Sequence, residues 1–200
     1  MVIRSGAQGA SMPLNKHYIS PQQLLEDSFR LGWQVFASGY RPTFIIAIWR
    51  GGTPVGIAVQ EILDHLGVKT DHIAIRTSSY YGIEKQKKRV RVHGLEYVTR
   101  QANWEDGLLI VDDVFDSGKS LKAIMRTLKS KMRRNLPGDI RIATPWYKPN
   151  KNVTDIVPDY FIHETDQWLV FPHELDGLTR AEIFANKPGM KILFESAGID

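Results

Sequence analysis

The chain of 200 residues contains no cysteine. This excludes disulfide bonds, zinc sites built from thiolates and a cysteine nucleophile, and it is compatible with the reducing cytosol. The chain also has no apolar run near the ~18 residues that a membrane-spanning helix needs. Residues 1–12 lack the apolar core of a secretory signal, which marks them as a leader or a disordered arm. We therefore expect a cytoplasmic protein with no membrane interaction.

Internal repeats, low-complexity tracts and interdomain linkers are absent as well. With 42% hydrophobic and 24% charged residues, the composition is that of a globular protein. A chain of this length can bury a substantial core. We predict a single domain that spans residues 1–200.

The formal net charge of +4 raises the question of nucleic-acid binding. Much of the excess lies in two basic runs: Lys85, Lys87, Lys88, Arg89 and Arg91, then Lys119, Lys122, Arg126, Lys129, Lys131, Arg133 and Arg134. Solvated faces explain most such runs, and positive charge also steers polyanionic substrates toward an enzyme. Nucleic-acid binding is therefore not the main role that we expect.

The most informative stretch is LLIVDDVFDSGKSL, residues 108–121. Its apolar start predicts a strand that is buried on both faces and ends at Asp112 and Asp113. A short polar turn follows, and then apolar residues recur at helical spacing: Leu121, Ile124, Met125, Leu128 and Met132. The N–H groups of such a turn lie at a helix N-terminus and favour a phosphate. Carboxylates accept hydrogen bonds from sugar hydroxyls or hold a hydrated divalent cation. The stretch therefore predicts a site for a phosphorylated sugar with its metal.

Two alternatives to this interpretation remain. Gly118, Lys119 and Ser120 match the end of the nucleotide-binding P-loop, but Asp113 stands where that motif needs its first glycine. A carboxylate there would repel phosphates. The other alternative is a buried strand and a capped helix without a ligand, which does not explain two adjacent acids at the strand end.

A second corner of the same kind precedes this stretch. Residues 43–49 predict a buried strand, and Arg50, Gly51 and Gly52 close it. Thr53 and Pro54 are expected to cap and begin a helix that ends at Gly67. In a doubly wound sheet such corners gather at the carboxyl ends of the strands, so both corners are expected to face one ligand.

The remaining elements are less specific. Ser20 and Pro21 predict the start of a helix that ends near Ser38, with core residues Leu24, Leu25, Phe29, Trp33 and Phe36. Strands are predicted at 71–76, 140–147 and 157–162, and a short aromatic segment at 167–172. Residues 77–101 lack a continuous pattern, which is typical of a lid or of disorder, and the alternation from 89 to 98 predicts a hairpin arm.

Residues VDDVFDSGKS resemble the phosphoribosyl-diphosphate (PRPP) signature of the type I phosphoribosyltransferases. From about residue 43 to residue 174 the chain is similar to the 6-oxopurine salvage branch of that family, which uses hypoxanthine, guanine or xanthine. The resemblance implies an α/β fold, with a central, mostly parallel sheet flanked by helices, a small hood and a mobile lid at 77–101. The N-terminal helix and the C-terminal region are expected to form the hood.

The resemblance also implies the activity. It is the formation of a nucleoside 5′-monophosphate and pyrophosphate from a 6-oxopurine and PRPP, with Mg²⁺ as cofactor, in a homo-oligomer that is a dimer or a tetramer. The residues implied in PRPP binding are Arg50, Gly51, Gly52, Asp112, Asp113, Val114, Phe115, Asp116, Ser117, Gly118, Lys119 and Ser120. A cis peptide bond is expected between Arg50 and Gly51.

Further roles follow for residues outside the signature. Lys148 offers a hydrogen-bond donor to the 6-oxo group, and Trp168 offers a flat face on which the purine ring can stack. The main chain at Leu169 offers donors and acceptors to the edge of the base. The lid is expected to include Ser78, Ser79 and Tyr80, and the metal ligands are expected among Asp112, Asp113 and Glu174. Asp116, the acid displaced into the turn, is the candidate general base.

Two other functions stay open at this point. The chain could be a PRPP-sensing regulator that binds nucleic acid through its basic segment, or a phosphoribosyltransferase for another base such as a pyrimidine. The sequence departs from its relatives at His173, where an aromatic residue is common. It therefore does not choose among hypoxanthine, guanine and xanthine.

Overall fold

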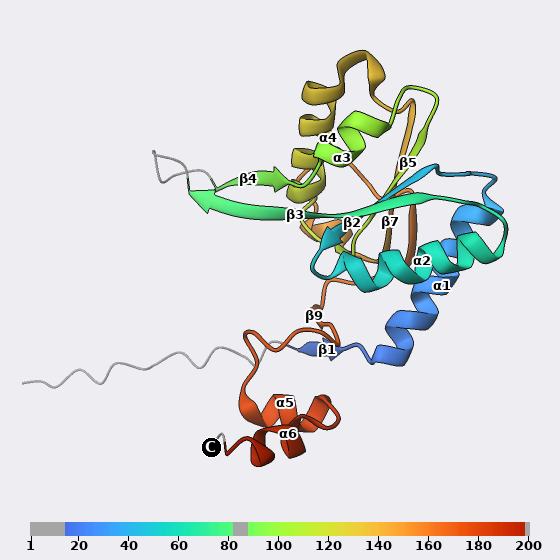
Figure 1. Ribbon diagram of the computed structural model, residues 1–200. Coiled ribbons are helices and arrows are strands. Elements are labelled where there is room, and N and C mark those ends of the chain that lie inside the picture. The colour runs from blue at the N-terminus through green and yellow to red at the C-terminus, as the bar shows by residue number, and fades with distance from the viewer. Residues whose placement is uncertain (1–14, 82–87, 199–200) are drawn as a thin grey trace, which may run out of the picture.

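The computed structural model describes residues 15–81 and 88–198, and it has an α/β architecture (Figure 1). The expectation for residues 1–12 and the lid residues 82–87 fall outside this range. The helices are α1 (Pro21–Ala37), α2 (Gly52–His65), α3 (Glu96–Gln101), α4 (Lys119–Met132), α5 (Arg180–Asn186) and α6 (Met190–Ser196). The strands are β1 (Lys16–Tyr18), β2 (Phe44–Trp49), β3 (Asp71–Tyr81), β4 (Lys88–His93), β5 (Gly107–Val111), β6 (Val114–Phe115), β7 (Asp139–Tyr147), β8 (Tyr160–Glu164) and β9 (Trp168–Val170).

The central sheet confirms the predicted fold class. Its strands follow the order β4, β3, β2, β5, β7, and β6 continues the pairing of β5 along β7 at the same register. Strand β8 pairs with β7 on its other side, and every pair is parallel except that of β3 with β4. In a parallel sheet, the carboxyl ends of β2, β5 and β7 meet at one edge. The two predicted corners follow β2 and β5 at that edge.

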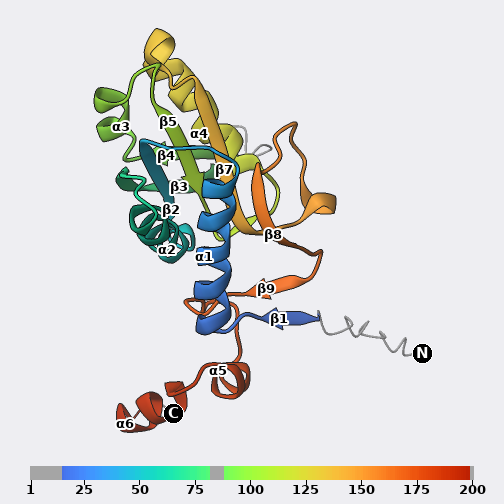
Figure 2. The same ribbon diagram turned by 90° about the vertical axis from the view of Figure 1, so that its right-hand side faces the viewer.

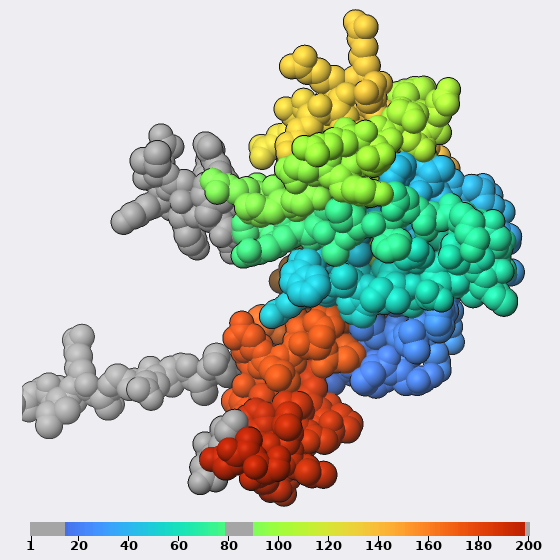
Figure 3. Space-filling view, viewed as in Figure 1, coloured from blue at the N-terminus to red at the C-terminus, as the bar shows by residue number. Residues whose placement is uncertain are grey.

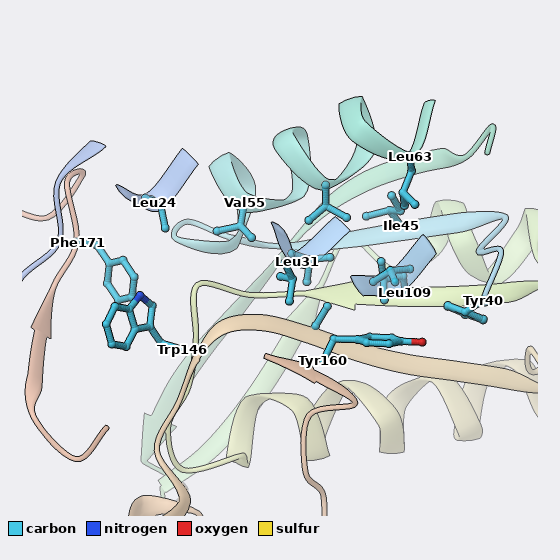
Figure 4. Close-up of a cluster of buried hydrophobic side chains, with 14 of the residues drawn as sticks. Leu24, Leu31, Tyr40, Ile45, Val55, Leu63, Leu109, Trp146, Tyr160 and Phe171 are labelled. Atoms are coloured by element: carbon cyan, nitrogen blue, oxygen red, sulfur yellow. The ribbon is translucent and has the colours of Figure 1, made fainter. Parts of the chain in front are cut away.

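Helices cover both faces of this sheet, which explains why its central strands are apolar throughout. Figure 1 shows α3 and α4 on one side and α1 and α2 on the other. Alternate residues of β2 and β5 point to opposite faces: Ile45 and Leu109 pack with α1 and α2 (Figure 4), whereas Ile46 and Ile110 pack with α3 and α4. All four are at most 1% exposed, so the strand ends that carry the site stand on a rigid core.

Helix α1 begins as predicted, but three of its five predicted core residues lie at the surface. The Ser20 hydroxyl accepts a hydrogen bond from the Gln23 N–H at 3.0 Å and caps the helix. Leu25, Phe29 and Trp33 are 44%, 38% and 54% exposed. Their four-residue spacing places them in a second apolar stripe beside the buried one. The sequence pattern does not distinguish the two stripes, so both were predicted to be core.

The expected hood exists, but α1 is not part of it. Strands β1 and β9 form a small parallel sheet apart from the central one, and α5 and α6 lie beyond it (Figures 1 and 2). Helix α1 instead packs along α2 on the face of the central sheet. Contact between His17 of β1 and Trp146 of β7, with ring centroids 5.2 Å apart, joins the hood to the body. The strand β1 and the two C-terminal helices had no prediction.

Three predicted boundaries were wrong. Strand β3 runs to Tyr81, five residues beyond its predicted end, because β4 pairs with it as an antiparallel hairpin. The hairpin arm ends at His93, and Val98 belongs to α3, where it is fully buried. Strand β8 begins at Tyr160, three residues later than predicted. Just before it, the Asp159 N–H donates to the Ile142 carbonyl, and the Asp159 carboxylate accepts a hydrogen bond from the Ile142 N–H, so a side chain takes part at this position in place of regular strand pairing.

None of the helices within residues 15–81 and 88–198 combines the length and the apolar character needed to cross a membrane.

Candidate active site

The corner after β2 is tighter than the sequence pattern predicted. The cis peptide bond joins Trp49 to Arg50, one bond before the predicted position. Helix α2 already begins at Gly52, so Thr53 lies inside its first turn and does not cap it. The Thr53 hydroxyl instead donates to the carbonyl of Arg50 and closes the corner. The sequence motif predicted the place of this turn correctly. The exact position of the cis peptide bond and of the start of α2 depends on the contacts of the turn with the end of β5.

The corners after β2 and β5 touch each other. A Cβ atom added at Gly51 would overlap the Asp113 carboxylate. One added at Gly52 would lie 2.6 Å from the Val111 carbonyl oxygen and 2.8 Å from the Cα of Asp112. Both glycines have ordinary negative φ angles or helical geometry, so space and not backbone conformation requires them. The two corners therefore lie side by side, which is the arrangement expected if both face one ligand.

The paired acids at the end of β5 create an electrostatic strain that a ligand can relieve. The backbone N–H of Asp113 donates to the Asp112 carboxylate at 3.1 Å and orients it. Burial, followed by the charge of Asp113, raises the pKa of Asp112 well above its ordinary value. Hydroxyl donors or a cation at this position would stabilise the charged form of the pair.

The turn between β6 and α4 encloses a small hollow of about 80 Å³. Its lining comes from the predicted turn: Asp112, Val114, Phe115, Asp116, Ser117, Gly118, Lys119, Ser120 and Leu121. Gly118 has a φ of +72° and lies against Asn152 and Thr154, so a side chain there would be both strained and crowded. The hollow lies at the N-terminus of a 14-residue helix, where unpaired N–H groups favour an anion.

Sequence reasoning missed the loop that supports this turn. The Asn152 side chain accepts hydrogen bonds from the N–H and the hydroxyl of Thr154, both at 2.9 Å. The Val153 N–H donates to the Ser117 carbonyl at 3.2 Å. An asparagine two residues before a threonine is typical of such a turn and was a usable signal.

The structure brings Lys148 to Asp116. Lys148 follows β7, is 9% exposed, and donates its backbone N–H to the Phe115 carbonyl at 2.9 Å. Its ammonium group lies 3.8 Å from the carboxylate of Asp116, which is half exposed. The candidate general base and the candidate 6-oxo ligand are therefore neighbours at the strand ends.

The C-terminal segment meets the site through His173. The imidazole Nε2 lies 3.5 Å from the Asp113 carboxylate, and the ring stacks on Phe171 with centroids 5.7 Å apart. Trp168 lies on β9 and is 53% exposed, while the Leu169 side chain is buried at 6% exposure. Figure 3 shows the surface of this segment next to the surface at the end of β2.

Other predicted site residues form local contacts of their own. The Glu174 carboxylate accepts a hydrogen bond from the Phe171 N–H at 3.0 Å and thus closes a local turn. Ser78, Ser79 and Tyr80 lie on β3, paired with β4, and the Ser78 hydroxyl contacts His93 at 3.2 Å. A larger hollow of about 650 Å³ lies at the opposite, amino ends of β5 and β7, far along the strands from the acids.

Comparison with known proteins identifies the fold family. Residues 19–176 match the model of the phosphoribosyl transferase domain. The chain belongs to this family. The matched range includes both corners, residues 50–52 and 112–120.

Relatives of this phosphoribosyltransferase include purine enzymes. A hypoxanthine-guanine phosphoribosyltransferase of Lactococcus lactis is 25% identical over 185 residues, which cover 90% of this chain and 91% of that protein. A purine phosphoribosyltransferase structure from Pyrococcus horikoshii is 26% identical, with a TM-score of 0.65 and coverage of 82% and 98%. A Neisseria gonorrhoeae protein crystallised with ppGpp is 18% identical with a TM-score of 0.71, covering 88% and 97%, which shows a shared fold.

The residues of this phosphoribosyltransferase fit a Mg²⁺ ion that is held mainly by its substrate. Within the residues that the structure describes, no three His, Asp or Glu side chains converge to hold a metal. Asp112, Asp113 and Glu174 therefore do not form a metal site by themselves, and an assisting role of any one of them stays a prediction. The adjacent pair Asp112 and Asp113 matches the one or two carboxylates with which proteins hold Mg²⁺ bound to a phosphate substrate.

Asp112→Asn is expected to raise the free energy of unfolding at neutral pH. In the wild-type protein the pKa of Asp112 is raised on folding, so the native state binds its proton more tightly than the unfolded state. Stability therefore falls as the pH rises from the ordinary aspartate value, about 4, through the raised pKa. Asparagine cannot ionise, so its advantage is present at pH 7 and vanishes below about pH 4.

Urea unfolding of both proteins at pH 7 and pH 3.5 measures this difference. Asp155→Asn is the control, because Lys122 lowers the pKa of that exposed carboxyl, so the substitution should bring no gain. A stability loss at pH 7 in Asp112→Asn would contradict the predicted strain.

Proposed function

We propose that this phosphoribosyltransferase acts in purine salvage, forming a nucleoside 5′-monophosphate and pyrophosphate from PRPP and a 6-oxopurine. The observation that carries the proposal is the contact of two strand-end corners, in which Gly51 lies against Asp113. One corner can hold the pyrophosphate, and the other can hold the phosphorylated ribose. The names of the purine relatives support the choice of base class.

For PRPP, each part of the site has a matching chemical group. The N–H groups at the start of α4 bind the 5′-phosphate, since they are unpaired and lie at the positive end of the helix. Asp112 and Asp113 accept hydrogen bonds from the ribose hydroxyls. The close packing at Gly51 and Gly52 lets the pyrophosphate approach the backbone next to Arg50.

For the base, Lys148 donates to the 6-oxo oxygen and Trp168 supplies a ring face. Lys148 is buried beside Asp116, which limits the water that competes for its ammonium group. Trp168 keeps 53% of its surface exposed, so its indole is free to stack on a purine. Lys148 directly follows β7 of the central sheet, and Trp168 lies on β9 of the hood.

The reaction breaks the bond between C1 of the ribose and the pyrophosphate oxygen, and it forms a bond from C1 to a purine nitrogen. Positive charge develops on the ribose and negative charge on the leaving group, so positioning and electrostatic stabilisation lower the barrier. Mg²⁺, when bound with PRPP, supplies neutralisation of the pyrophosphate charge. Asp116 accepts the proton that the purine loses, and Lys148 holds the oxo group in place.

The hairpin of β3 and β4 is proposed as the arm of the lid. It projects from the body at the edge of the sheet (Figure 1). Closure of this arm over PRPP would keep water from replacing the purine at C1. Ser78, Ser79 and Tyr80 lie on this arm and would move with it.

The experiment that tests the function is an ultraviolet assay with PRPP and Mg²⁺ against six bases in parallel: hypoxanthine, guanine, xanthine, adenine, uracil and orotate. Turnover with at least one 6-oxopurine is expected, together with loss of turnover on removal of the metal by a chelator. Turnover with uracil or orotate alone would favour a pyrimidine enzyme. PRPP binding without turnover, combined with salt-sensitive binding of RNA or DNA, would favour the regulator.

Asp116→Asn is expected to lower kcat roughly 10²–10⁴-fold, the usual contribution of a general base. PRPP affinity should change far less, because Asp112, Asp113 and the N–H groups of the turn remain. Steady-state kinetics with calorimetric PRPP binding separate the two effects, with Asp155→Asn as a control. An equal loss in turnover and PRPP affinity would show that Asp116 only positions the substrate.

A homo-oligomer is part of the proposal, and the exposed stripe of Leu25, Phe29 and Trp33 on α1 supports it. We propose that this stripe packs against the same stripe of a second copy of the chain. Glu26 and Arg30 flank the stripe with opposite charges, so two antiparallel α1 helices related by a twofold axis would pair them.

Trp33→Glu is expected to shift the protein toward monomers in size-exclusion chromatography with light scattering. Ile57→Glu on α2, at a side chain that is 61% exposed, should leave the assembly unchanged and serves as the control. A monomeric wild type, or an oligomer that withstands Trp33→Glu, would contradict the proposed interface.

A further inference from the structure

Lys187 is a buried lysine that the reaction does not use. It follows α5, is 8% exposed, and donates its ammonium group to the Phe171 carbonyl. Burial lowers the pKa of Lys187, and the charge of Glu174 opposes this shift. Burying an ammonium group is unfavourable unless it gains strong partners. The packing of two short helices does not by itself explain why a lysine is buried at position 187.

The partner of Lys187 is the backbone of Phe171, the residue that follows β9 and its Trp168. The Phe171 carbonyl also accepts a hydrogen bond from the Glu174 N–H at 3.0 Å, and the Phe171 N–H donates to the Glu174 carboxylate at 3.0 Å. The Phe171 ring is 2% exposed and lies beside Trp146 in the core (Figure 4). Lys187 thus completes a set of hydrogen bonds to both backbone groups of Phe171, the first residue after β9.

Strand β9 is also held by the C-terminal helices from its other side. Lys16 of β1 pairs with Trp168 in register, and its ammonium group lies 2.7 Å from Glu182 of α5. Glu182 in turn forms a capping box with Thr179 that fixes the start of α5. Two lysines therefore link the region of α5 to the strand that carries Trp168. Lys16 does so through β1, the strand paired with β9, and Lys187 does so at Phe171, just after β9 ends.

We propose that Lys187 is a positioning residue for purine binding: it fixes the Phe171 peptide and so holds Trp168 and the main chain after it in the orientation that stacks on the base. This inference rests on the proposed function. It extends the site beyond residues 19–176, the part that matches the family, to helix α5. When the residues of a binding site are already held in place, little conformational entropy is lost as the ligand binds, and the affinity is higher.

Lys187→Met and Lys187→Gln are the test variants. Met fills the same space without a charge, and Gln keeps an N–H donor if Met destabilises the fold. The KM for the purine should rise roughly tenfold in Lys187→Met, since small misplacements of binding groups have effects of this order. The KM for PRPP should rise far less, because the link from Lys187 to the corner at Asp113 runs indirectly through His173, whose ring stacks on Phe171. Lys191→Met on α6, where the lysine side chain is 65% exposed, is the matched control.

Hydrogen–deuterium exchange provides a readout that does not depend on turnover. Amides of residues 168–171 should exchange faster in both Lys187 variants, while those of residues 112–120 keep the wild-type rate. Equal rises in both KM values, or unchanged exchange at 168–171, would overturn the role of Lys187. A wild type inactive with every base, whose variants still show the faster exchange, would refute the proposed function and with it the role in purine binding, while showing that Lys187 holds residues 168–171 in place.

Discussion

The contact between Gly51 and Asp113 is the constraint on which the rest of the site depends. It requires two parallel strands to end at the same level, and the sheet provides this because β2 and β5 are neighbours in register. It also requires residues without side chains at Gly51 and Gly52. The acids can then lie directly beside the corner after β2. Any movement of β2 against β5 would open the site.

The same arrangement stores electrostatic energy. Asp112 and Asp113 are held close together at the end of a buried strand, and the pKa of Asp112 is raised as a result. The buried strand contributes stability that offsets this repulsion, since Leu109 and Ile110 are fully enclosed. A ligand that donates hydroxyls or brings a cation relieves the repulsion. Binding energy is therefore available at the point where the ribose is proposed to lie.

Local patterns predicted the central sheet and both corners well. An apolar run followed by acids and a glycine-bearing turn is specific for a strand, a turn and a helix, and β5 with α4 confirmed it. Patterns failed where a distant partner decides the structure. Strand β1 exists because β9 pairs with it, and β3 is long because β4 returns along it. Contacts such as that of Lys187 with Phe171 have no local signal, because sixteen residues separate the partners.

The crystal structure of the protein with PRPP and Mg²⁺ tests the central claim most directly. The account predicts the 5′-phosphate at the N–H groups of residues 116–120, the ribose hydroxyls on Asp112 and Asp113, and the pyrophosphate beside Arg50 and Gly51. A PRPP molecule bound elsewhere, for example in the hollow at the amino ends of β5 and β7, would contradict it. So would a complex in which the corners after β2 and β5 had moved apart.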